Sequence, residues 1–433
     1  MDMETAGLNT GLSRRGMLAG SGTLSLLSAI ELAITPAHAA DVKSDAAMLK
    51  VFEAMMARIS RVAETAFARS TAQYPNARAA GLLHILNNIS LGLSMNLHND
   101  DPMNPDLFHY FDPSRKQGGD NSDALYLGAP IDGRQEYRVR GNRGSAKHIS
   151  FTTVNRGPTP WGGGMGAALF GRDMKADPDG NFELMLSARE HSGNWLKLGP
   201  DVFRLTIRQF FADWENERPM VARIERLGPP APPPDMSADR IMAALDETIG
   251  WLENTVVFWQ NMIDLFRKTP NQFIDWRKIT GDKMNATPGG DPACCFWKVP
   301  KGKALILRTK PPQCEFWNIE FTNPWWETND YRYRHTGIND HTGVLEENGE
   351  LIAVVAHDDP GLPNWFDPSG HTEGMIGRRW MFADTATSIE TMLVDQSTLR
   401  KYLPKSVKTI TAEGRRAQLE RKRNGLYRRF HWF

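Results

Sequence analysis

The chain of 433 residues lacks several features that would assign it directly to a functional class. Its 51 basic residues equal its 51 acidic residues, so no net charge draws it to nucleic acid or to an anionic bilayer. Its three cysteines, Cys294, Cys295 and Cys314, form neither a disulfide framework nor a metal-binding spacing. No Gly-x-Ser-x-Gly turn, phosphate loop or dinucleotide fingerprint is present, which argues against esterase, ATPase and NAD-dependent functions. These absences leave a small neutral or weakly charged molecule as the expected ligand.

Long apolar runs are also missing, so no transmembrane segment is expected. Residues 1–39 resemble a twin-arginine export signal, with Ser13-Arg14-Arg15-Gly16-Met17-Leu18 as the motif and Ala37-His38-Ala39 as the cleavage site. Met17, Ala19 and Glu31 depart from the ideal pattern, and a cytoplasmic protein with an irregular leader is the alternative. The sequence predicts a periplasmic or secreted protein that uses the twin-arginine export machinery, where one disulfide from Cys314 is conceivable.

Residues 40–105 carry the pattern of a helical hairpin. Two apolar series recur at steps of three and four residues and are separated by the turn-like Tyr74-Pro75-Asn76. The two series comprise Leu49, Phe52, Met56 and Ile59, and then Leu82, Leu86, Ile89 and Leu93.

Residues 106–228 change to an alternating pattern of period two, which is typical of half-buried antiparallel strands. Ile149, Phe151 and Thr153, for example, alternate with polar neighbours. Several short strands without intervening helices favour a sandwich or a jelly roll over a doubly wound sheet.

Residues 229–290 are expected to be a linker and a long helix. The run Gly228 to Pro234 is rich in proline and favours an extended spacer. An apolar stripe from Ile241 to Phe266 then predicts a helix with Ser237 as its N-cap, packed on more than one side and situated between the two β units.

Residues 291–400 repeat the order of the first β unit. Ile149-Ser-Phe-Thr matches Ile319-Glu-Phe-Thr, and Arg208 to Asp213 matches Arg379 to Asp384. This agreement indicates an internal repeat. The predicted fold class is α+β, mainly β, with two antiparallel β-sandwich or jelly-roll-like units, an N-terminal helical hairpin and a connecting helix.

Two further stretches resemble a known family. Gly118 to Leu127, followed by Tyr137 to Gly144, and the phrase Leu362 to His371 in the second unit, are similar to the bacterial domain-of-unknown-function (DUF) family 1214. The resemblance covers most of the mature chain and implies a β-sandwich or jelly-roll architecture. It implies no settled reaction and supplies no catalytic residues.

The loop from His357 to Asp384 holds most of the candidate chemistry, because loops on a rigid sandwich usually carry ligand groups. A histidine and a carboxylate can move a proton while an arginine holds an anionic or polarised oxygen. The candidate catalytic residues are His357, Asp359, Asp367, His371, Glu373 and Arg378.

Two alternatives compete with that interpretation. Four of the same residues, His357, Asp359, His371 and Glu373, are acceptable ligands for a divalent metal, although their spacing matches no specific signature. The structural alternative is that these side chains form turns and backbone contacts. Under it, Arg379 pairs with Asp384 or its counterpart, and Arg208 and Arg379, shared by both copies, form salt bridges that hold the fold.

A second cluster is expected to bind a ring-bearing substrate, because aromatic and arginine side chains can stack on a ring. An exposed hairpin with a solvated face is the alternative interpretation. The candidate substrate-binding residues are Trp325, Trp326, Tyr331, Tyr333, His335 and Trp365.

The tail at residues 401–433 is basic and ends in aromatic residues, which predicts a helix docked by its aromatic end with solvated arginines. Contact with anionic lipid or a partner subunit is the alternative.

As a whole, the sequence predicts an exported enzyme, a hydrolase or lyase that uses acid/base chemistry on a small sugar-like or alicyclic substrate without a cofactor. The competing hypothesis is a ligand-binding or structural envelope protein. The catalytic hypothesis requires His357, His371 and a carboxylate to share one pocket.

Overall fold

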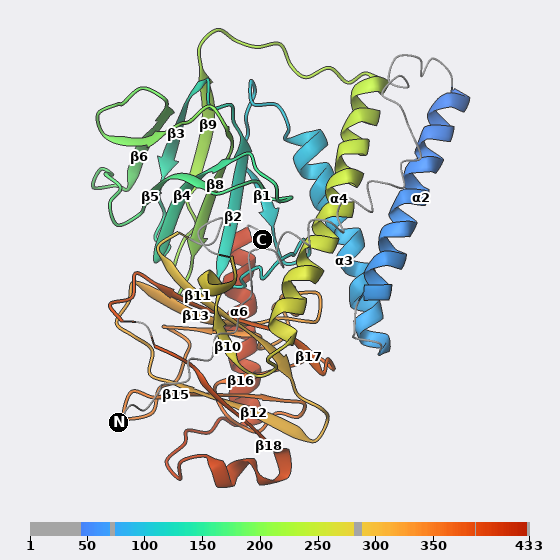
Figure 1. The fold of residues 1–433 in the computed structure, drawn as a ribbon. Helices are drawn as coiled ribbons and strands as arrows, with labels where there is room; N and C mark the ends of the chain where they lie inside the picture. The colour runs from blue at the N-terminus through green and yellow to red at the C-terminus, as the bar shows by residue number, and fades with distance from the viewer. Residues whose placement is uncertain (1–44, 70–73, 281–287, 386, 431–433) are drawn as a thin grey trace, which may run out of the picture.

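A computed structural model of the chain describes residues 45–69, 74–280, 288–385 and 387–430. The predicted export signal at residues 1–39 lies outside the described residues. Two β units are stacked one above the other, and three long helices run along one side of the stack (Figure 1). The predicted α+β class with two sandwich-like units is confirmed.

The first unit is a sandwich of a five-stranded and a four-stranded sheet, with strand orders β1-β2-β8-β4-β5 and β7-β6-β3-β9. Its strands are β1 (Phe108–Phe111), β2 (Ala124–Pro130), β3 (Glu136–Asn142), β4 (His148–Asn155), β5 (Met165–Phe170), β6 (Asn181–Ser187), β7 (Asn194–Lys197), β8 (Val202–Phe210) and β9 (Val221–Leu227).

The second unit repeats this topology strand for strand. Its sheets have the orders β10-β11-β17-β13-β14 and β16-β15-β12-β18, so adding nine to each strand number of the first unit yields the second. Even the parallel pair β6-β7 recurs, as β15-β16. Its strands are β10 (Phe273–Asp275), β11 (Gly290–Lys298), β12 (Lys303–Thr309), β13 (Phe316–Phe321), β14 (Gly337–Asn339), β15 (Leu351–Ala356), β16 (Trp365–Phe366), β17 (Glu373–Met381) and β18 (Glu390–Asp395). The internal repeat predicted from the sequence is therefore present in the fold.

Each sandwich encloses its own core, because alternate residues of every strand point inward. Phe151 and Ile207 lie in the core of the first unit, and Ile319, Ile376 and Trp380 lie in that of the second. The opposite face of each five-stranded sheet is turned toward the other unit.

Those two outer faces meet in a layer of apolar and aromatic side chains. Tyr126 and Phe210 of the first unit share a buried cluster with Phe316 and Met381 of the second. The rings of Phe210 and Phe316 are 5.4 Å apart. The central strands β8 and β17 therefore present their outward side chains to a common interior between the units.

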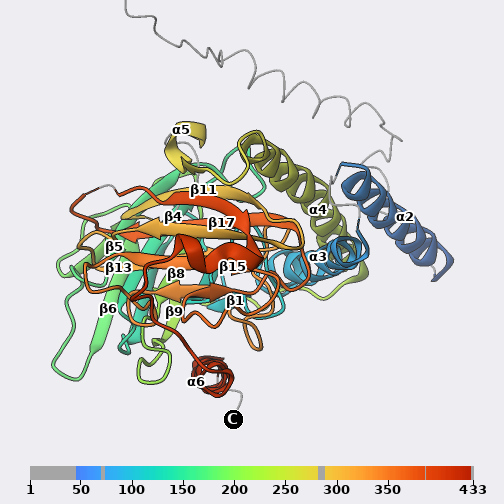
Figure 2. The ribbon, with the colours of Figure 1, turned by 90° about the horizontal axis from the view of Figure 1, so that it is seen from below.

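The helices form a layer beside this interface. The N-terminal helices α2 (Asp45–Arg69) and α3 (Pro75–Leu93) pack with α4 (Ala238–Arg267), and the π-helix η2 (Ser94–His98) extends α3. Arg58 of α2 donates to Glu253 of α4 at 2.9 Å, and Ser237 caps α4 as its sequence predicts. Helix α4 runs along both β units rather than between them (Figures 1 and 2). A short helix, α5 (Trp276–Thr280), follows β10, and none of the described helices is long and apolar enough to cross a membrane.

The basic tail forms a 3-10 helix, η4 (Gln396–Tyr402), and then α6 (Ala412–Phe430), which crosses both units on a different side from α2 to α4 (Figure 2). The expectation of solvated arginines is wrong for Arg415 and Arg429, which are buried, and Lys422 is buried as well. Lys422 donates to the carbonyl of Gly337 in the second unit at 3.1 Å, and Arg429 donates to the carbonyl of Ser122 in the first at 2.6 Å. Helix α6 thus connects the two units through buried cations.

Candidate functional site: a cavity between the two units

A cavity of about 150 Å³ lies where the outer faces of the two five-stranded sheets meet α4 and α5. Strands β8 and β17 supply its arginines, and the segment between β1 and β2 supplies Gly118, Gly119 and Asp120. Its walls include many aromatic side chains. The aromatic residues that line it are Tyr110, Phe111, Tyr126, Trp161, Phe258, Trp259, Trp276 and Trp326.

Two arginines that line this cavity carry buried nitrogen atoms without a hydrogen-bond partner. Arg208 is only 8% exposed, and its Nη1 is buried without a hydrogen-bond partner. Arg379 donates from Nη2 to the carbonyl of Gly119 at 2.6 Å, but its Nη1 is also buried without a partner. A third arginine, Arg204, donates to the carbonyl of Trp161 at 2.9 Å, and burial lowers its pKa to about 10. With Arg378, four arginines therefore line one small space.

Three of these arginines are not held by carboxylates. Within the described part of the chain, no carboxylate forms an ion pair with Arg204, Arg208 or Arg379, whereas Arg378 pairs with Asp291 at 3.1 Å. The salt bridge expected between Arg379 and Asp384 is not formed. A buried charge without a counter-charge is costly, and a buried donor without an acceptor indicates a missing ligand, ion or water. The two unpartnered nitrogen atoms therefore remain without an acceptor from the protein itself.

The strand register refines the relation between Arg208 and Arg379. Ser150 lies opposite Arg208, while its counterpart in the repeat, Glu320, lies opposite Gly377. The two arginines are thus one pleat, two residues, apart along equivalent strands rather than at identical positions. Two residues preserve the face of a strand, so both side chains still point between the units.

Two buried carboxyl groups share the cavity with the arginines. Asp120 accepts hydrogen bonds from the backbone and hydroxyl of Thr328 at 3.0 and 2.6 Å, and burial raises its pKa to about 6. Glu320 is 1% exposed, and burial, with the nearby charge of Asp123, raises its pKa to about 8. Burial therefore favours the protonated form of Glu320.

The cavity wall contains a backbone conformation that is costly for a large residue. Trp326 lies in the left-handed region with φ of 59°, and such strain is concentrated at functional sites. Gly118, at φ of 59°, packs so closely that a Cβ there would lie 2.3 Å from the ring of Trp259. The indole Nε1 of Trp259 is buried without a partner. The wall therefore combines flat apolar surface with an available hydrogen-bond donor.

Among the predicted catalytic residues, the two histidines and Glu373 do not line the cavity. His357 Nε2 lies 2.9 Å from the carbonyl oxygen of Val299. His371 Nδ1 lies 3.2 Å from the hydroxyl of Tyr74, and burial lowers the pKa of His371 to about 4. Glu373 is buried at the start of β17. This cavity therefore does not bring together the two histidines and a carboxylate that the catalytic hypothesis requires.

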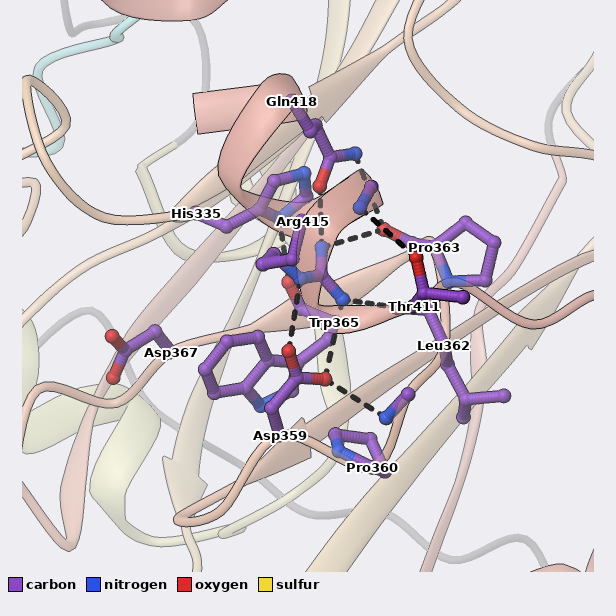
Figure 3. A network of polar contacts seen from close by, with 12 residues as sticks. His335, Asp359, Pro360, Leu362, Pro363, Trp365, Asp367, Thr411, Arg415 and Gln418 are labelled. Carbon is purple, nitrogen blue, oxygen red and sulfur yellow. Dashed lines mark hydrogen bonds and ion pairs between the residues drawn. The ribbon is translucent and has the colours of Figure 1, made fainter. Parts of the chain in front are cut away.

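The predicted catalytic aspartates are engaged with arginines elsewhere. Asp359 accepts from Arg415 Nε at 3.0 Å and thereby anchors α6, whose Arg415 points into the loop at Leu362 and Pro363 (Figure 3). Asp367 accepts from Arg334 at 2.8 Å and from the backbone of Ser369. These contacts match the structural alternative, in which the loop residues form turns and support the fold.

Two of the predicted site residues do line the cavity, Arg378 and Trp326. The guanidinium of Arg378 is held by Asp291 and by the carbonyl of Thr387, and burial lowers its pKa. Trp326 presents its ring beside that of Trp259, with the centroids 5.5 Å apart. Of the two, Trp326 is the one whose predicted contact with a ligand the geometry favours.

The other predicted substrate-binding residues have structural contacts. Trp325 is fully buried and donates to Ala77 of α3 at 2.7 Å, and His335 Nδ1 lies 2.5 Å from the carbonyl of Trp365. Burial holds the pKa of His335 well below its usual range.

The remaining aromatic residues of that set contact cations of the protein itself. The indole of Trp365 lies 5.1 Å beneath Arg415, and the ring of Tyr331 lies 4.7 Å beneath the amino group of Lys116. Tyr333 is exposed and lies 5.0 Å from the guanidinium of Arg423.

Metal ligation finds little support in the geometry. Across the described ranges, no three His, Cys, Asp or Glu side chains are grouped so that they could hold a metal ion. All three cysteines are free, and burial raises the pKa of Cys294, which lines the cavity, to about 12.

Sequence reasoning missed the residues that define the cavity. Arg208 and Arg379 recur in both copies, and the sequence pattern predicts that each forms a salt bridge that holds the fold. The signal that distinguishes them is their position on the outward face of a central strand, where an antiparallel sandwich usually meets solvent. A charged residue there is unremarkable until a second unit covers that face.

Comparisons with known proteins identify one family. Residues 123–213 match the model described as a protein of unknown function, DUF1214. This segment is therefore similar to the DUF1214 family. The DUF1214 match lies on the first unit and contains Arg204, Arg208 and Tyr126 of the cavity. The resemblance noted in the sequence is confirmed, although its most specific phrase lies in the second unit.

The chain also resembles solved structures. An uncharacterized protein from Burkholderia cenocepacia is 28% identical, with a TM-score of 0.77, over 81% of this chain and 99% of that one. The VPA0106 protein from Vibrio parahaemolyticus is 13% identical, with a TM-score of 0.41, over 72% and 96% of the two chains. No curated protein matches the sequence.

Proposed function

We propose that this protein binds a small organic anion in the cavity between its two units. The observation that carries the proposal is the buried Nη1 of Arg208, which has no partner in a cavity that Arg379 also lines. Guanidinium groups match the geometry of carboxylates and phosphates, and a hydrogen bond between two charged groups is about twice as strong as a neutral one. A ligand anion would supply the missing counter-charge.

The size and lining of the cavity narrow the ligand class. A cavity of about 150 Å³ can hold roughly one benzene-sized ring. The aromatic walls favour an apolar body, and the arginines favour an acidic group at one end. We therefore infer a monocarboxylate or a similar monoanion with a single ring or a short branched chain.

The test is calorimetric titration with benzoate, cyclohexanecarboxylate, inorganic phosphate and sulfate at pH 7. Replacing Arg208 or Arg379 with methionine should weaken binding of the best ligand about tenfold each, and the double variant about a hundredfold, because each removes a charge-assisted hydrogen bond. Arg134→Met, at an exposed arginine paired with Asp132, is the matched control and should bind like the wild type.

A stability measurement separates a ligand-binding arginine from a fold-holding one. Without ligand, Arg208→Met should leave the melting temperature unchanged or raise it, because an apolar side chain replaces a buried unpaired charge. A marked fall in melting temperature would indicate that Arg208 holds the fold. Absence of binding by all four anions would count against the proposed function.

Acid/base catalysis is a second candidate, favoured by one observation. Asp120 and Glu320 line the same cavity as the arginines and have pKa values raised toward neutrality. Proton transfer in hydrolysis or elimination works best when the pKa of the catalytic group lies near the working pH. If this protein is an enzyme, these carboxyl groups are better placed than His357 and His371, since they lie beside the proposed anion.

We also propose that the protein is exported through the twin-arginine pathway. The support is the sequence Ser13-Arg14-Arg15-Gly16-Met17-Leu18 followed by Ala37-His38-Ala39. The double variant Arg14→Lys/Arg15→Lys should keep the protein in the cytoplasmic fraction, as judged by cell fractionation and immunoblotting. Equal amounts of the variant and the wild type in the periplasm would contradict this proposal.

A further inference from the structure

The outward face of α2 carries a regular stripe of charged and small side chains. Its members are exposed and follow one another at steps of three or four residues, so they share one side of the helix. The buried residues Met55, Val62 and Ala66 lie on the opposite side. Helix α2 is also the outer edge of the helical layer, so the stripe points away from the rest of the molecule (Figures 1 and 2). The stripe consists of Ala46, Lys50, Glu53, Ala57, Arg61, Glu64 and Ala68.

The four charged side chains of this stripe are not used inside the chain. The salt bridges between α2 and α4 come from Arg58, which pairs with Glu253 at 2.8 Å and also with Asp246. The four charges of the stripe form no ion pair with any other residue that the structure describes. They are therefore available to charges of another molecule.

The stripe is symmetric about Ala57, with the sign of each charge reversed. Lys50 lies seven residues before Ala57, and Glu64 lies seven residues after it. Glu53 lies four residues before Ala57, and Arg61 lies four residues after it. A second α2 that runs antiparallel, related by a two-fold axis at Ala57, therefore places each cation opposite an anion.

The pattern selects one orientation and one register of such a pair. In a parallel pair, each charge would lie opposite its own copy, and like charges repel. Sliding the antiparallel pair by three residues in one direction would bring Glu53 opposite Glu64. Sliding it by three residues in the other direction would bring Lys50 opposite Arg61. A two-fold contact at Ala57 avoids both clashes and forms each favourable pair twice.

The neighbouring helix α3 adds apolar surface to the same hairpin. Leu82, Leu83 and Leu86 share one face of α3, and each is more than half exposed. Leu49 and Phe52 of α2 are exposed as well. Single exposed apolar residues are ordinary on a monomer, whereas a group of them beside a patterned set of charges is typical of a protein interface.

We propose that α2 and α3 form a two-fold interface with a second copy of this chain, so that two hairpins make an antiparallel bundle of four helices. Lys50 of one copy pairs with Glu64 of the other, and Glu53 pairs with Arg61. Alanine at position 57 allows the two α2 axes to approach to about 8 Å, the short end of ordinary helix packing. The leucines of α3 lie beside these pairs and are covered by the second copy. The interface is independent of the anion proposed for the cavity.

Sedimentation velocity of the purified chain over a range of concentrations tests this proposal. The wild type should be a dimer at micromolar concentration. An acidic variant, Lys50→Glu/Arg61→Glu, and a basic variant, Glu53→Lys/Glu64→Lys, should each raise the dissociation constant about a hundredfold, because all four pairs become repulsive together. An equimolar mixture of the two variants should recover the dimer as a one-to-one heterodimer, since opposite charges meet again.

Further variants separate the interface from general effects of charge. Lys197→Glu/Lys301→Glu makes the same change in net charge at exposed sites on the two β units, and it should dimerise like the wild type. Leu83→Glu/Leu86→Glu should be monomeric, because it places charges in the apolar part of the interface. All the substituted side chains are exposed, and circular dichroism melts close to that of the wild type establish that the variants are folded.

Three results would overturn the proposal. The first is a wild type that stays monomeric at the highest concentration measured. The second is a dimer that persists unchanged in the acidic and basic variants, because the contact would then lie elsewhere on the molecule. The third is a mixture of these two variants that stays monomeric, because the charges would then not pair across the interface.

Discussion

Replacing Asp123 with alanine should lower the free energy of unfolding by about 4 kcal/mol, the cost of removing one partner from a buried charged network. Asp123 is buried where the two units meet. It accepts hydrogen bonds from Trp214 at 2.8 Å, Asn339 at 2.8 Å and Asn318 at 3.0 Å. It also faces Lys422 of α6, whose pKa burial lowers. The variant would remove the carboxylate that accepts from three donors and the negative charge that faces a buried cation.

Chemical denaturation monitored by tryptophan fluorescence measures the loss for Asp123→Ala. Asp132→Ala is the matched control, because Asp132 pairs with exposed Arg134 at the surface and should cost less than about 1 kcal/mol. A loss below about 1.5 kcal/mol for Asp123→Ala would show that water replaces the carboxylate in this network.

Replacing Trp325 with alanine should also cost about 4 kcal/mol, within the range for truncation of a buried tryptophan. Trp325 joins the helical layer to the second unit. Its indole donates to the carbonyl of Ala77, stacks on His84 at 5.7 Å, and packs so closely that a Cβ on Gly81 would lie 2.2 Å from the ring. The variant would leave a cavity between α3 and the loop after β13.

Two measurements distinguish loss of helix docking from loss of core packing in Trp325→Ala. Hydrogen exchange should accelerate first in α2 and α3, because local opening follows the weakened contact. Trp325→Phe keeps most of the ring and loses only the indole hydrogen bond, so it should cost about 1 to 2 kcal/mol. Uniform exchange across the whole chain in Trp325→Ala would argue that the helices and the second unit open together.

The architecture could be predicted because burial on a sheet has a period of two. Ile149, Phe151, Ile319 and Phe321 all point into a sandwich core, and the alternation that placed them there is visible in the sequence. The repeat was equally visible, since equivalent strands kept equivalent apolar residues. These signals are local, so they require no knowledge of how the units pack.

The cavity could not be predicted because it depends on the contact between the units. Glu320 and Arg208 are about 110 residues apart in the sequence and belong to different sandwiches. Each lies on an outward strand face, where polar residues are ordinary. The sequence instead predicts a site from polar residues that are close together in one loop, such as Asp367 and His371. In the structure, Asp367 accepts from the backbone of Ser369 in a turn, and His371 contacts Tyr74.

The basic tail illustrates the same limit of local patterns. Its mean composition indicates a solvated helix, but Arg415 and Lys422 lie over the tryptophans Trp365 and Trp214 at 5.1 and 4.7 Å. An arginine or lysine can be buried in an interface when its cation faces an aromatic ring and a carboxylate. Charge alone did not reveal which face of α6 docks.

The two units repeat one topology within a single chain. This repetition bears on the symmetry of the cavity between them and of any ligand that fits it. Two identical subunits meeting through these faces would form a cavity with a two-fold axis and would suit a symmetric ligand or two equal half-sites. In one chain, the two halves can differ, and they do: Ser150 in one corresponds to Glu320 in the other. Two repeats in one chain thus allow this cavity to depart from two-fold symmetry, which suits a molecule whose two ends are chemically different.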